Sequence, residues 1–277
     1  MYSKIQEGLD ILSEEGPVSF VRETLTYLYE TVRYSVFDKY TLSVGDAEVV
    51  FTAPNQTVFR RNKRRFETER GEITDILEEI NEDDVFFDIG ANTGLYTLFV
   101  GKRHPSVDVV AFEPYPPNVQ LLNRDVERNN LKNIDVWEIA LSDSEGTVEF
   151  SQPEQEDVGY GSSSIESNAS KSNTVVEAPT RSGDELISHG DIPAPNVIKI
   201  DVEGAEPLVI DGMKNALDQP ECRLVYCEIH RSDVEYRPSI SDFGVTLSDM
   251  KSRFEALGFE VEELQTESSE VLFKAYK

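Results

Sequence analysis

Carboxylate side chains mark the ends of several short apolar runs in this sequence. Asp88 lies in the first run, and Glu113, Asp201 and Glu228 stand at or near the ends of three later ones. If these runs are parallel strands, their carboxyl ends meet at one edge of a sheet, where open α/β folds bind ligands. Grouping carboxylates costs free energy, because their negative charges repel one another, unless the group binds a cation, a proton or a hydrogen-bonded ligand. The spacing therefore predicts a binding or catalytic site at this edge.

A glycine turn follows the first run, with Gly90 and Gly94 on either side of Asn92. Glycine lets the backbone turn tightly and approach a ligand closely. The Gly-x-x-x-Gly spacing differs from the Gly-x-Gly-x-x-Gly fingerprint that holds a dinucleotide pyrophosphate. The turn therefore favours a ligand without phosphate, and Asp88 suits a cationic amino-acid group. Taken alone, an ordinary strand-to-helix turn would explain the two glycines equally well.

The second and third runs add a candidate nucleoside site. Glu113 and Pro114 come just past the second run, where a carboxylate can accept hydrogen bonds from both hydroxyls of a ribose. The third run ends in Ala140, Leu141 and Ser142, whose small and apolar groups followed by a polar one can hold an adenine ring. The sequence therefore predicts a nucleoside beside the glycine turn.

A denser acidic group follows the fourth and fifth runs. Asp201, Glu203 and Glu206 come directly after the fourth run, and Glu228 and His230 end the fifth. Carboxylates at such density are typical of sites that handle a proton, a cation or a polar ligand. For His230 alone, a structural histidine at a strand end is the competing interpretation.

The segments that position these residues alternate between strand and helix patterns from residue 85 onward, which is typical of βαβ units. The last two strands are joined by residues 265–269, a connection too short for a crossover helix, so they must pair antiparallel. The predicted fold is α/β, a doubly wound and mostly parallel sheet with an antiparallel C-terminal strand. Its predicted strands are Val85–Ile89, Val107–Phe112, Ile134–Glu138, Val197–Ile200, Leu224–Ile229, Glu260–Leu264 and Glu270–Ala275, and its predicted helices are Leu95–Lys102, Pro117–Asn129, Ala205–Leu217 and Thr246–Leu257.

Residues 1–84 are predicted to extend the domain formed by residues 85–277. Apolar positions three and four apart predict an amphipathic helix over 17–39, packed on the domain or offered to a membrane or partner. The next elements are a hairpin, Tyr40–Val44 and Glu48–Thr52, and a short helix around Ile73–Ile80. The interval 151–172 has loop composition, and a loop of that length is either a functional lid or disordered.

The ordered motifs resemble the FkbM family of S-adenosylmethionine-dependent methyltransferases. The similarity covers 88–97, 111–114 with Asn118, 140–143, 161–165 and 198–206. It implies the class I methyltransferase architecture, S-adenosylmethionine as cofactor, and methyl transfer to oxygen atoms, often on sugars or polyketides. The donor site that it implies comprises Asp88, Gly90, Asn92, Gly94, Glu113, Pro114, Asn118, Ala140, Leu141 and Ser142.

Methyl transfer to a hydroxyl also needs a group that takes the proton. His230 is the leading candidate base, because an unperturbed pKa near 6.5 suits that work at neutral pH, and Glu228 is a candidate to orient it. We expect Asp201 to face the donor, and Glu203 or Glu206 to face the acceptor, a hydroxyl or carboxyl oxygen of a glycan or related polar metabolite. A divalent cation held by Asp201, Glu228 and His230 is an alternative that we do not predict.

Two other classes of protein share such a sheet. A nicotinamide-dependent oxidoreductase is disfavoured by the missing pyrophosphate fingerprint. A non-catalytic nucleotide-binding protein is disfavoured by the complete set of Asp88, Glu113 and Asp201. The basic segment 60–65, with Arg70, either holds an anionic group of the acceptor or is a solvated face.

The amino-acid composition limits the classes of partner that we expect. The 277 residues include 53 acidic and 26 basic side chains, a net charge of −27, which repels phosphate backbones and makes nucleic acid an unexpected partner. Molar salt reduces the Debye length to about 3 Å and screens such self-repulsion, so we expect a halophilic source.

Cys222 and Cys227 lie too far apart on one strand to be bridged, which fits a reducing cytoplasm. No apolar run is long enough for a membrane span, so we expect a soluble, cytoplasmic protein.

Overall fold

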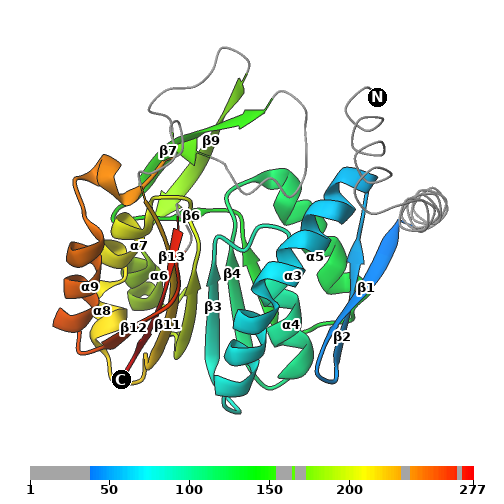
Figure 1. Cartoon of the computed structure of the whole chain (residues 1–277), viewed down its shortest axis with the longest axis horizontal. Helices are drawn as coiled ribbons and strands as arrows, with labels where there is room; N and C mark the ends of the chain where they lie inside the picture. The colour runs from blue at the N-terminus through cyan, green and yellow to red at the C-terminus, as the bar shows by residue number, and fades with distance from the viewer. Residues whose placement is uncertain (1–37, 154–163, 166–172, 232–237, 267–269) are drawn as a thin grey trace, which may run out of the picture.

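The computed structural model describes residues 38–153, 164–165, 173–231, 238–266 and 270–277. Its centre is a seven-stranded sheet with five adjacent parallel strands, to which a C-terminal antiparallel hairpin is added (Figure 1). This arrangement confirms the predicted doubly wound sheet and its antiparallel closing strand. In spatial order the strands are β12 (Glu260–Thr266), β13 (Glu270–Tyr276), β11 (Leu224–His230), β10 (Val197–Ile200), β3 (Val85–Ile89), β4 (Asp108–Phe112) and β5 (Ile134–Trp137).

Both faces of this sheet are covered, and successive side chains of a strand enter two different hydrophobic clusters. In β3, for example, Phe86 packs in one cluster and Phe87 in the other, and neither is exposed. One cluster includes side chains from α3 (Gln56–Glu79), α4 (Leu95–Arg103) and α5 (Pro116–Arg128). The opposite cluster includes side chains from α6 (Gly183–His189), α7 (Glu206–Gly212), α8 (Lys214–Asp218), the 3₁₀ turn η1 (Ile240–Phe243) and α9 (Leu247–Ala256).

The hairpin β1 (Lys39–Val44) and β2 (Ala47–Thr52) forms where the sequence predicts it, with Gly45 at φ +57° in the turn. It packs through aromatic contacts: Tyr40 and Phe51 stack with their ring centroids 5.6 Å apart, and Phe51 lies 6.0 Å from Phe99 of α4. The hairpin therefore shares a hydrophobic cluster with the main sheet.

Helix α3 corrects the prediction of a short helix around Ile73–Ile80, because it begins much earlier, at Gln56. Asn55 caps it by accepting a hydrogen bond from the Val58 backbone N–H at 2.9 Å. Its first half carries the basic segment, where apolar side chains are sparse, so the helical period is weak there. Phe66 nevertheless buries itself against Phe99, with ring centroids 5.7 Å apart.

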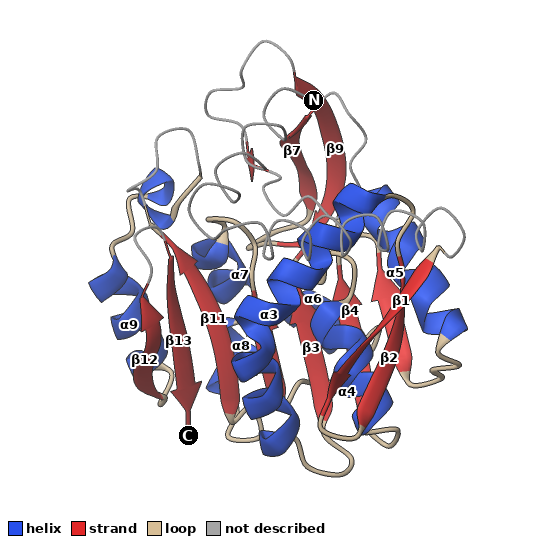
Figure 2. Cartoon of the chain, turned by 45° about the vertical axis from the view of Figure 1, so that its right-hand side comes forward, coloured by secondary structure: helices blue, strands red, loops and turns tan. Residues whose placement is uncertain are grey.

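A second, smaller sheet includes residues 151–153 and 164–165, and there it corrects the expectation of a loop. Its strands, in spatial order, are β6 (Ala140–Leu141), β9 (Asn173–Arg181), β7 (Gly146–Pro153) and β8 (Ser164–Ile165). Figure 2 shows β7 and β9 rising beyond the end of the main sheet. Residues 154–163 and 166–172, which make up most of the interval predicted as a loop, lie outside the described residues.

One further predicted helix is divided in the structure, and another lies outside the described residues. The helix expected over Ala205–Leu217 is divided at Met213 into α7 and α8, and a Cβ on the preceding Gly212 would lie 1.9 Å from the Ser142 carbonyl oxygen. The amphipathic helix expected over 17–39 lies outside the described residues, apart from its last two positions. Within the described ranges, the helices are too short or too polar to cross a membrane.

Candidate active site

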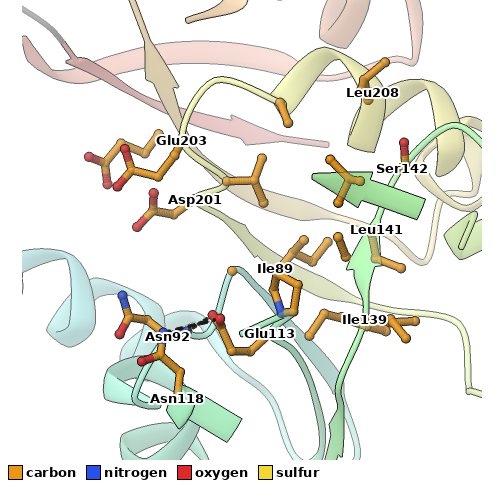
Figure 3. A pocket seen from close by; sticks show the side chains of 18 of the residues that line it. Ile89, Asn92, Glu113, Asn118, Ile139, Leu141, Ser142, Asp201, Glu203 and Leu208 are labelled. Atoms are coloured by element: carbon orange, nitrogen blue, oxygen red, sulfur yellow. Dashed lines mark hydrogen bonds between the residues drawn. The ribbon is translucent and has the colours of Figure 1, made fainter. Parts of the chain in front are cut away.

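A cavity of about 330 Å³ opens at the carboxyl edge of the main sheet and has two chemically different halves (Figure 3). We call the first the glycine-turn half and the second the acidic half. The glycine-turn half is lined by Gly90, Asn92, Glu113, Pro114, Asn118, Ile139, Ala140, Leu141, Ser142 and Leu208. The acidic half is lined by Arg61, Arg65, Glu69, Asp201, Glu203, Glu228 and Glu270.

The glycine turn is held in place by contacts that leave no room for a side chain. Gly90 has φ +83°, and a Cβ there would lie 1.8 Å from the Asp201 carbonyl oxygen. The backbone N–H groups of Gly90 and Ala91 both donate to the carbonyl of Phe112, at 2.9 and 3.0 Å. The turn after β3 is therefore packed directly against the end of β10, and this packing joins the two halves of the cavity.

Asp88 and Gly94 support the turn and are not among the residues that line the cavity. The Asp88 carboxylate is buried and accepts a hydrogen bond from the Thr97 backbone N–H at 2.9 Å, which ties β3 to α4. Burial raises the pKa of Asp88. Gly94 has φ +84° at the start of α4, and a Cβ there would meet the Leu122 side chain at 2.2 Å.

Glu113 is the carboxylate of the glycine-turn half, and its position is fixed by three donors. Its Oε2 accepts from the Asn92 backbone N–H at 2.8 Å, and its Oε1 accepts from the Tyr115 backbone N–H at 2.9 Å and from Asn118 Nδ2 at 3.3 Å. Burial raises the pKa of Glu113 to about 7, and the three hydrogen bonds limit that rise. Figure 3 shows Glu113 and Asn92 together at one side of the cavity, joined by this hydrogen bond.

The opposite wall of this half is apolar. Ala140 and Leu141 form strand β6, and the Ser142 N–H donates to the Arg181 carbonyl at 3.0 Å, so the second sheet fixes their position. Ile139 and Leu208 complete the wall (Figure 3), and neither was singled out from the sequence. Leu208 lies in α7, far along the chain, and an apolar helix position carries no sequence signal of its contact with a cavity.

The acidic half and the side chains directly behind it bring together the residues expected after the fourth and fifth strands. Asp201, Glu203 and Glu228 line the cavity, whereas His230 does not. Asp201 and Glu203 follow β10, and Glu228 and His230 end β11. The His230 ring has 1% exposure, and its Nε2 lies 3.5 Å from Glu203 Oε2 and 4.0 Å from both Asp201 Oδ1 and Glu228 Oε1.

Glu206 has a different place from the one expected. It is fully buried in the first turn of α7, where its Oε1 lies 2.7 Å from His230 Nδ1 and accepts from the Gly204 N–H at 2.9 Å. The carboxylate that orients His230 is therefore Glu206 and not Glu228. Glu206 contacts the Nδ1 side of the imidazole, whereas Nε2 faces Glu203, and Glu206 is not among the residues that line the cavity.

The surroundings of His230 also change its chemistry. Burial by itself lowers the pKa of the ring, but the hydrogen bond and charge of Glu206, with Glu203 and Asp201 nearby, raise it to about 10. The prediction that His230 is the base requires the pKa of its ring to be near 6.5. In this environment the ring is protonated at neutral pH, so it stabilises negative charge more readily than it accepts a proton.

Two cations in this half connect it to distant parts of the chain. Arg65 of α3 donates from Nη2 to Asp201 Oδ2 at 3.1 Å and from Nε to Glu69 at 2.7 Å. Lys199 is buried within β10, with its Nζ 3.7 Å from Asp201 Oδ2 and 3.8 Å from Glu228 Oε2. Sequence reasoning missed Lys199, although a lysine in an otherwise apolar strand was a signal that could have identified it.

The basic residues of α3 fall into two groups, one at the cavity and one exposed to solvent. Arg61 and Arg65 line the acidic half, whereas Arg60, Lys63, Arg64 and Arg70 are exposed. One side of the helix therefore meets the cavity and the other is solvated.

The order of the main sheet and the position of this cavity at its carboxyl edge define a class I methyltransferase fold. The family model described as "Methyltransferase FkbM domain" matches residues 88–261, more than half of the chain. The chain therefore belongs to the FkbM family of methyltransferases, as the ordered motifs predicted.

The chain is also similar to individual proteins. Hexuronic acid methyltransferase AglP of Haloferax volcanii is 36% identical over 155 residues, which are 56% of this chain and 59% of the relative, so the match spans less than two thirds of that protein. The 31-O-demethyl-FK506 methyltransferase FkbM of Streptomyces tacrolimicus is 28% identical over 180 residues, 56% of this chain and 68% of the relative. Among solved structures, precorrin-6y C5,15-methyltransferase from Geobacter metallireducens GS-15 aligns with a TM-score of 0.47 and 14% identity, covering 76% of this chain and 88% of that one.

Proposed function

We propose that this protein transfers a methyl group from S-adenosylmethionine to a hydroxyl or carboxyl oxygen of an acidic glycan or related polar metabolite. The observation that carries the proposal is a single cavity that joins a nucleoside-type half to a half rich in charged side chains. Methyl transfer needs such a cavity, because donor and acceptor must be held in line within one site.

In this proposal the glycine-turn half holds the donor. Glu113 accepts hydrogen bonds from the ribose hydroxyls, and the apolar wall of Ile139, Leu141 and Leu208 covers the adenine. The carbonyl of Asp201 meets the glycine turn, so Asp201 lies where the two halves join and the sulfonium is expected. A negative side chain there stabilises the positively charged donor.

The reaction itself is a displacement at the methyl carbon. A C–O bond forms as the C–S bond breaks, the electron pair of that bond goes to sulfur, and S-adenosylhomocysteine leaves as a neutral thioether. A hydroxyl acceptor gives its proton to Asp201 or Glu203, because His230 already holds a proton at neutral pH. A carboxylate acceptor needs no proton transfer.

An acidic acceptor is supported by two observations. Arg61 and Arg65 line the acidic half, and guanidinium groups bind carboxylates through paired hydrogen bonds. A relative sharing 36% identity is described as a hexuronic acid methyltransferase. We therefore propose a uronic acid unit as the acceptor.

Calorimetry in molar KCl tests the donor assignment, using S-adenosylmethionine, S-adenosylhomocysteine and NAD in turn. Glu113→Ala should weaken S-adenosylmethionine binding by about 1.5–3 kcal/mol, because hydrogen bonds to a charged group are lost. Glu149→Ala, at an exposed position of β7, serves as the control and should bind like the unchanged protein.

Three outcomes would contradict the proposal. Binding of NAD in place of the methyl donor would favour a nicotinamide-dependent oxidoreductase. Donor binding without methyl transfer to any hexuronic acid oligosaccharide or other glycan would favour a non-catalytic nucleotide-binding protein. A product methylated only on nitrogen would exclude oxygen as the acceptor atom.

A further inference from the structure

We propose that the acidic half binds one divalent metal ion of the Mn²⁺ type, with His230 Nε2, Asp201 and Glu203 as its ligands. The metal site deepens the proposed function, and only the role assigned to the ion rests on that function. The binding site itself stands on the geometry of described residues.

The first observation is the state of the His230 ring. Its Nδ1 is engaged by Glu206, whereas its Nε2 has no hydrogen-bond partner although the side chain has only 1% exposure. A buried ring nitrogen without a partner is costly unless something fills its place. Histidines that bind metals typically donate their other N–H to a carboxylate, which fixes the ring and directs the free nitrogen at the ion. Glu206 has that position here, and an ion bound at Nε2 would take the place of the proton that the metal-free ring holds there at neutral pH.

The second observation is the spacing of the possible ligand atoms. His230 Nε2 lies 3.5 Å from Glu203 Oε2 and 4.0 Å from Asp201 Oδ1, and one donor atom from each of the three residues lies within 4.8 Å of the others. An ion that binds each atom at roughly 2.0–2.3 Å needs neighbouring ligand atoms about 3–3.5 Å apart. The separations of 3.5 Å, 4.0 Å and at most 4.8 Å reach beyond that spacing, so side-chain shifts on the order of an ångström would complete the coordination.

The third observation is a concentration of carboxyl groups. Among the described residues around His230 and Lys199 these are Glu69, Glu72, Asp201, Glu203, Glu206, Glu228 and Glu270, and the cations include Arg61, Arg65, Lys199 and His230. Burial raises the pKa of Glu72 to about 7 and the pKa of Glu228 well above its usual range, so these two groups hold protons more readily than an exposed carboxyl group. Charges removed from water need compensation, and a divalent cation would supply part of it. Glu228 and Glu270 form a second set of donor atoms with the same His230 and can receive the ion if it moves.

The mixture of ligands indicates the class of metal. Carboxylates favour Mg²⁺, Ca²⁺ and Mn²⁺, whereas an imidazole favours the transition metals, so one imidazole with several carboxylates best suits Mn²⁺. In the proposed reaction the ion would add to the attraction that Arg61 and Arg65 exert on an acidic acceptor, and would lower the pKa of an acceptor hydroxyl.

The test uses the full chain, stripped with EDTA and kept in molar KCl so that weak binding of ions to the acidic surface is screened. Mn²⁺ is titrated while the electron paramagnetic resonance signal of the free ion is recorded. We expect one site per chain, and both His230→Ala and Glu203→Gln should weaken it at least tenfold. His189→Ala removes an exposed histidine of α6 and should leave the affinity unchanged.

The result that overturns the proposal is the absence of a saturable site, or equal Mn²⁺ affinity in all three variants and the unchanged protein. Glu203 is partly exposed, so Glu203→Gln gives a valid comparison even if His230→Ala fails to fold. Binding of S-adenosylmethionine to the metal-free protein is measured on the same samples. Donor binding without a manganese site would refute the metal proposal alone, whereas a manganese site without donor binding would refute the proposed function alone.

Discussion

The two halves of the cavity place charged groups by different means. In the glycine-turn half, one carboxylate, Glu113, is held by backbone N–H groups of its own and the preceding turn. In the acidic half, Asp201 and Glu228 are held by side chains from other elements, including Arg65 of α3 and Lys199 of β10. The first arrangement is rigid and local. The second depends on how α3, β10 and β11 pack, so its charges and geometry can change when an ion or substrate binds.

The largest expected effect comes from the contact that joins the halves. Gly90→Ala places a Cβ 1.8 Å from the Asp201 carbonyl oxygen, so the turn or β10 must move, and we expect a loss of at least about 3 kcal/mol in the free energy of unfolding. Gly190→Ala is the matched control, because Gly190 also has positive φ but has open space around it. It should cost only about 1–2 kcal/mol. Equal losses in chemical denaturation would mean that backbone conformation, and not close approach, constrains Gly90.

The next effect tests the charge balance of the acidic half. Lys199→Met leaves Asp201 and Glu228 without their buried cation, and we expect a loss of about 3 kcal/mol at pH 8. Lys274→Met, which breaks ion pairs nearer the surface, should cost about 1 kcal/mol or less.

The loss of stability in Lys199→Met should also depend on pH, and the direction of that dependence can be derived. Removing the cation raises the pKa of the neighbouring carboxyl groups in the folded state above their unfolded values. Such groups bind more protons when folded, so stability falls as pH rises through that interval and the defect of Lys199→Met should shrink toward pH 5. A defect that is constant from pH 5 to pH 8 would show that lost packing, and not charge, causes it.

A smaller effect is the pH dependence of S-adenosylmethionine binding in the glycine-turn half. The pKa of Glu113 is raised to about 7 by burial, and we expect the ionised form to bind the ribose hydroxyls. Lowering the pH from 8 to 6 protonates the group in the free protein, so S-adenosylmethionine affinity should fall about tenfold. Calorimetry on Glu113→Gln supplies the control, since that variant should lose most of this dependence. An unchanged slope would assign the titration to another group.

The smallest expected effect concerns the acceptor. Arg61→Ala should raise KM for hexuronic acid oligosaccharides several-fold, a change of about 1 kcal/mol, because one partly exposed guanidinium is lost from the acidic half. Donor affinity should remain the same. Lys63→Ala, exposed on the same helix, should change neither quantity. If the two variants behave alike in a methyl-transfer assay, the basic segment acts only through its overall charge.

Local sequence determined the glycine-turn half and the positions of the main strands along the chain. A strand that ends in a glycine turn, and a carboxylate one strand later, occupy neighbouring positions in any sheet with this connection, so Gly90, Asn92 and Glu113 could be placed from spacing alone. The antiparallel pairing of β12 and β13 followed from the shortness of their connection. Hydrophobic runs were strong enough to define the seven strands of the main sheet.

Tertiary structure decided the acidic half. The pairing of Glu206 with His230, and of Arg65 with Asp201 across 136 residues, depends on which way a helix turns its side chains toward a neighbouring strand. Hydrophobic periodicity does not determine that orientation. It also missed the first half of α3 and the strands β7 and β9, whose polar sequences carry little of the period that reveals buried elements. The protonation state of His230 followed from the same packing, because a pKa depends on the charges and burial that only the folded chain creates.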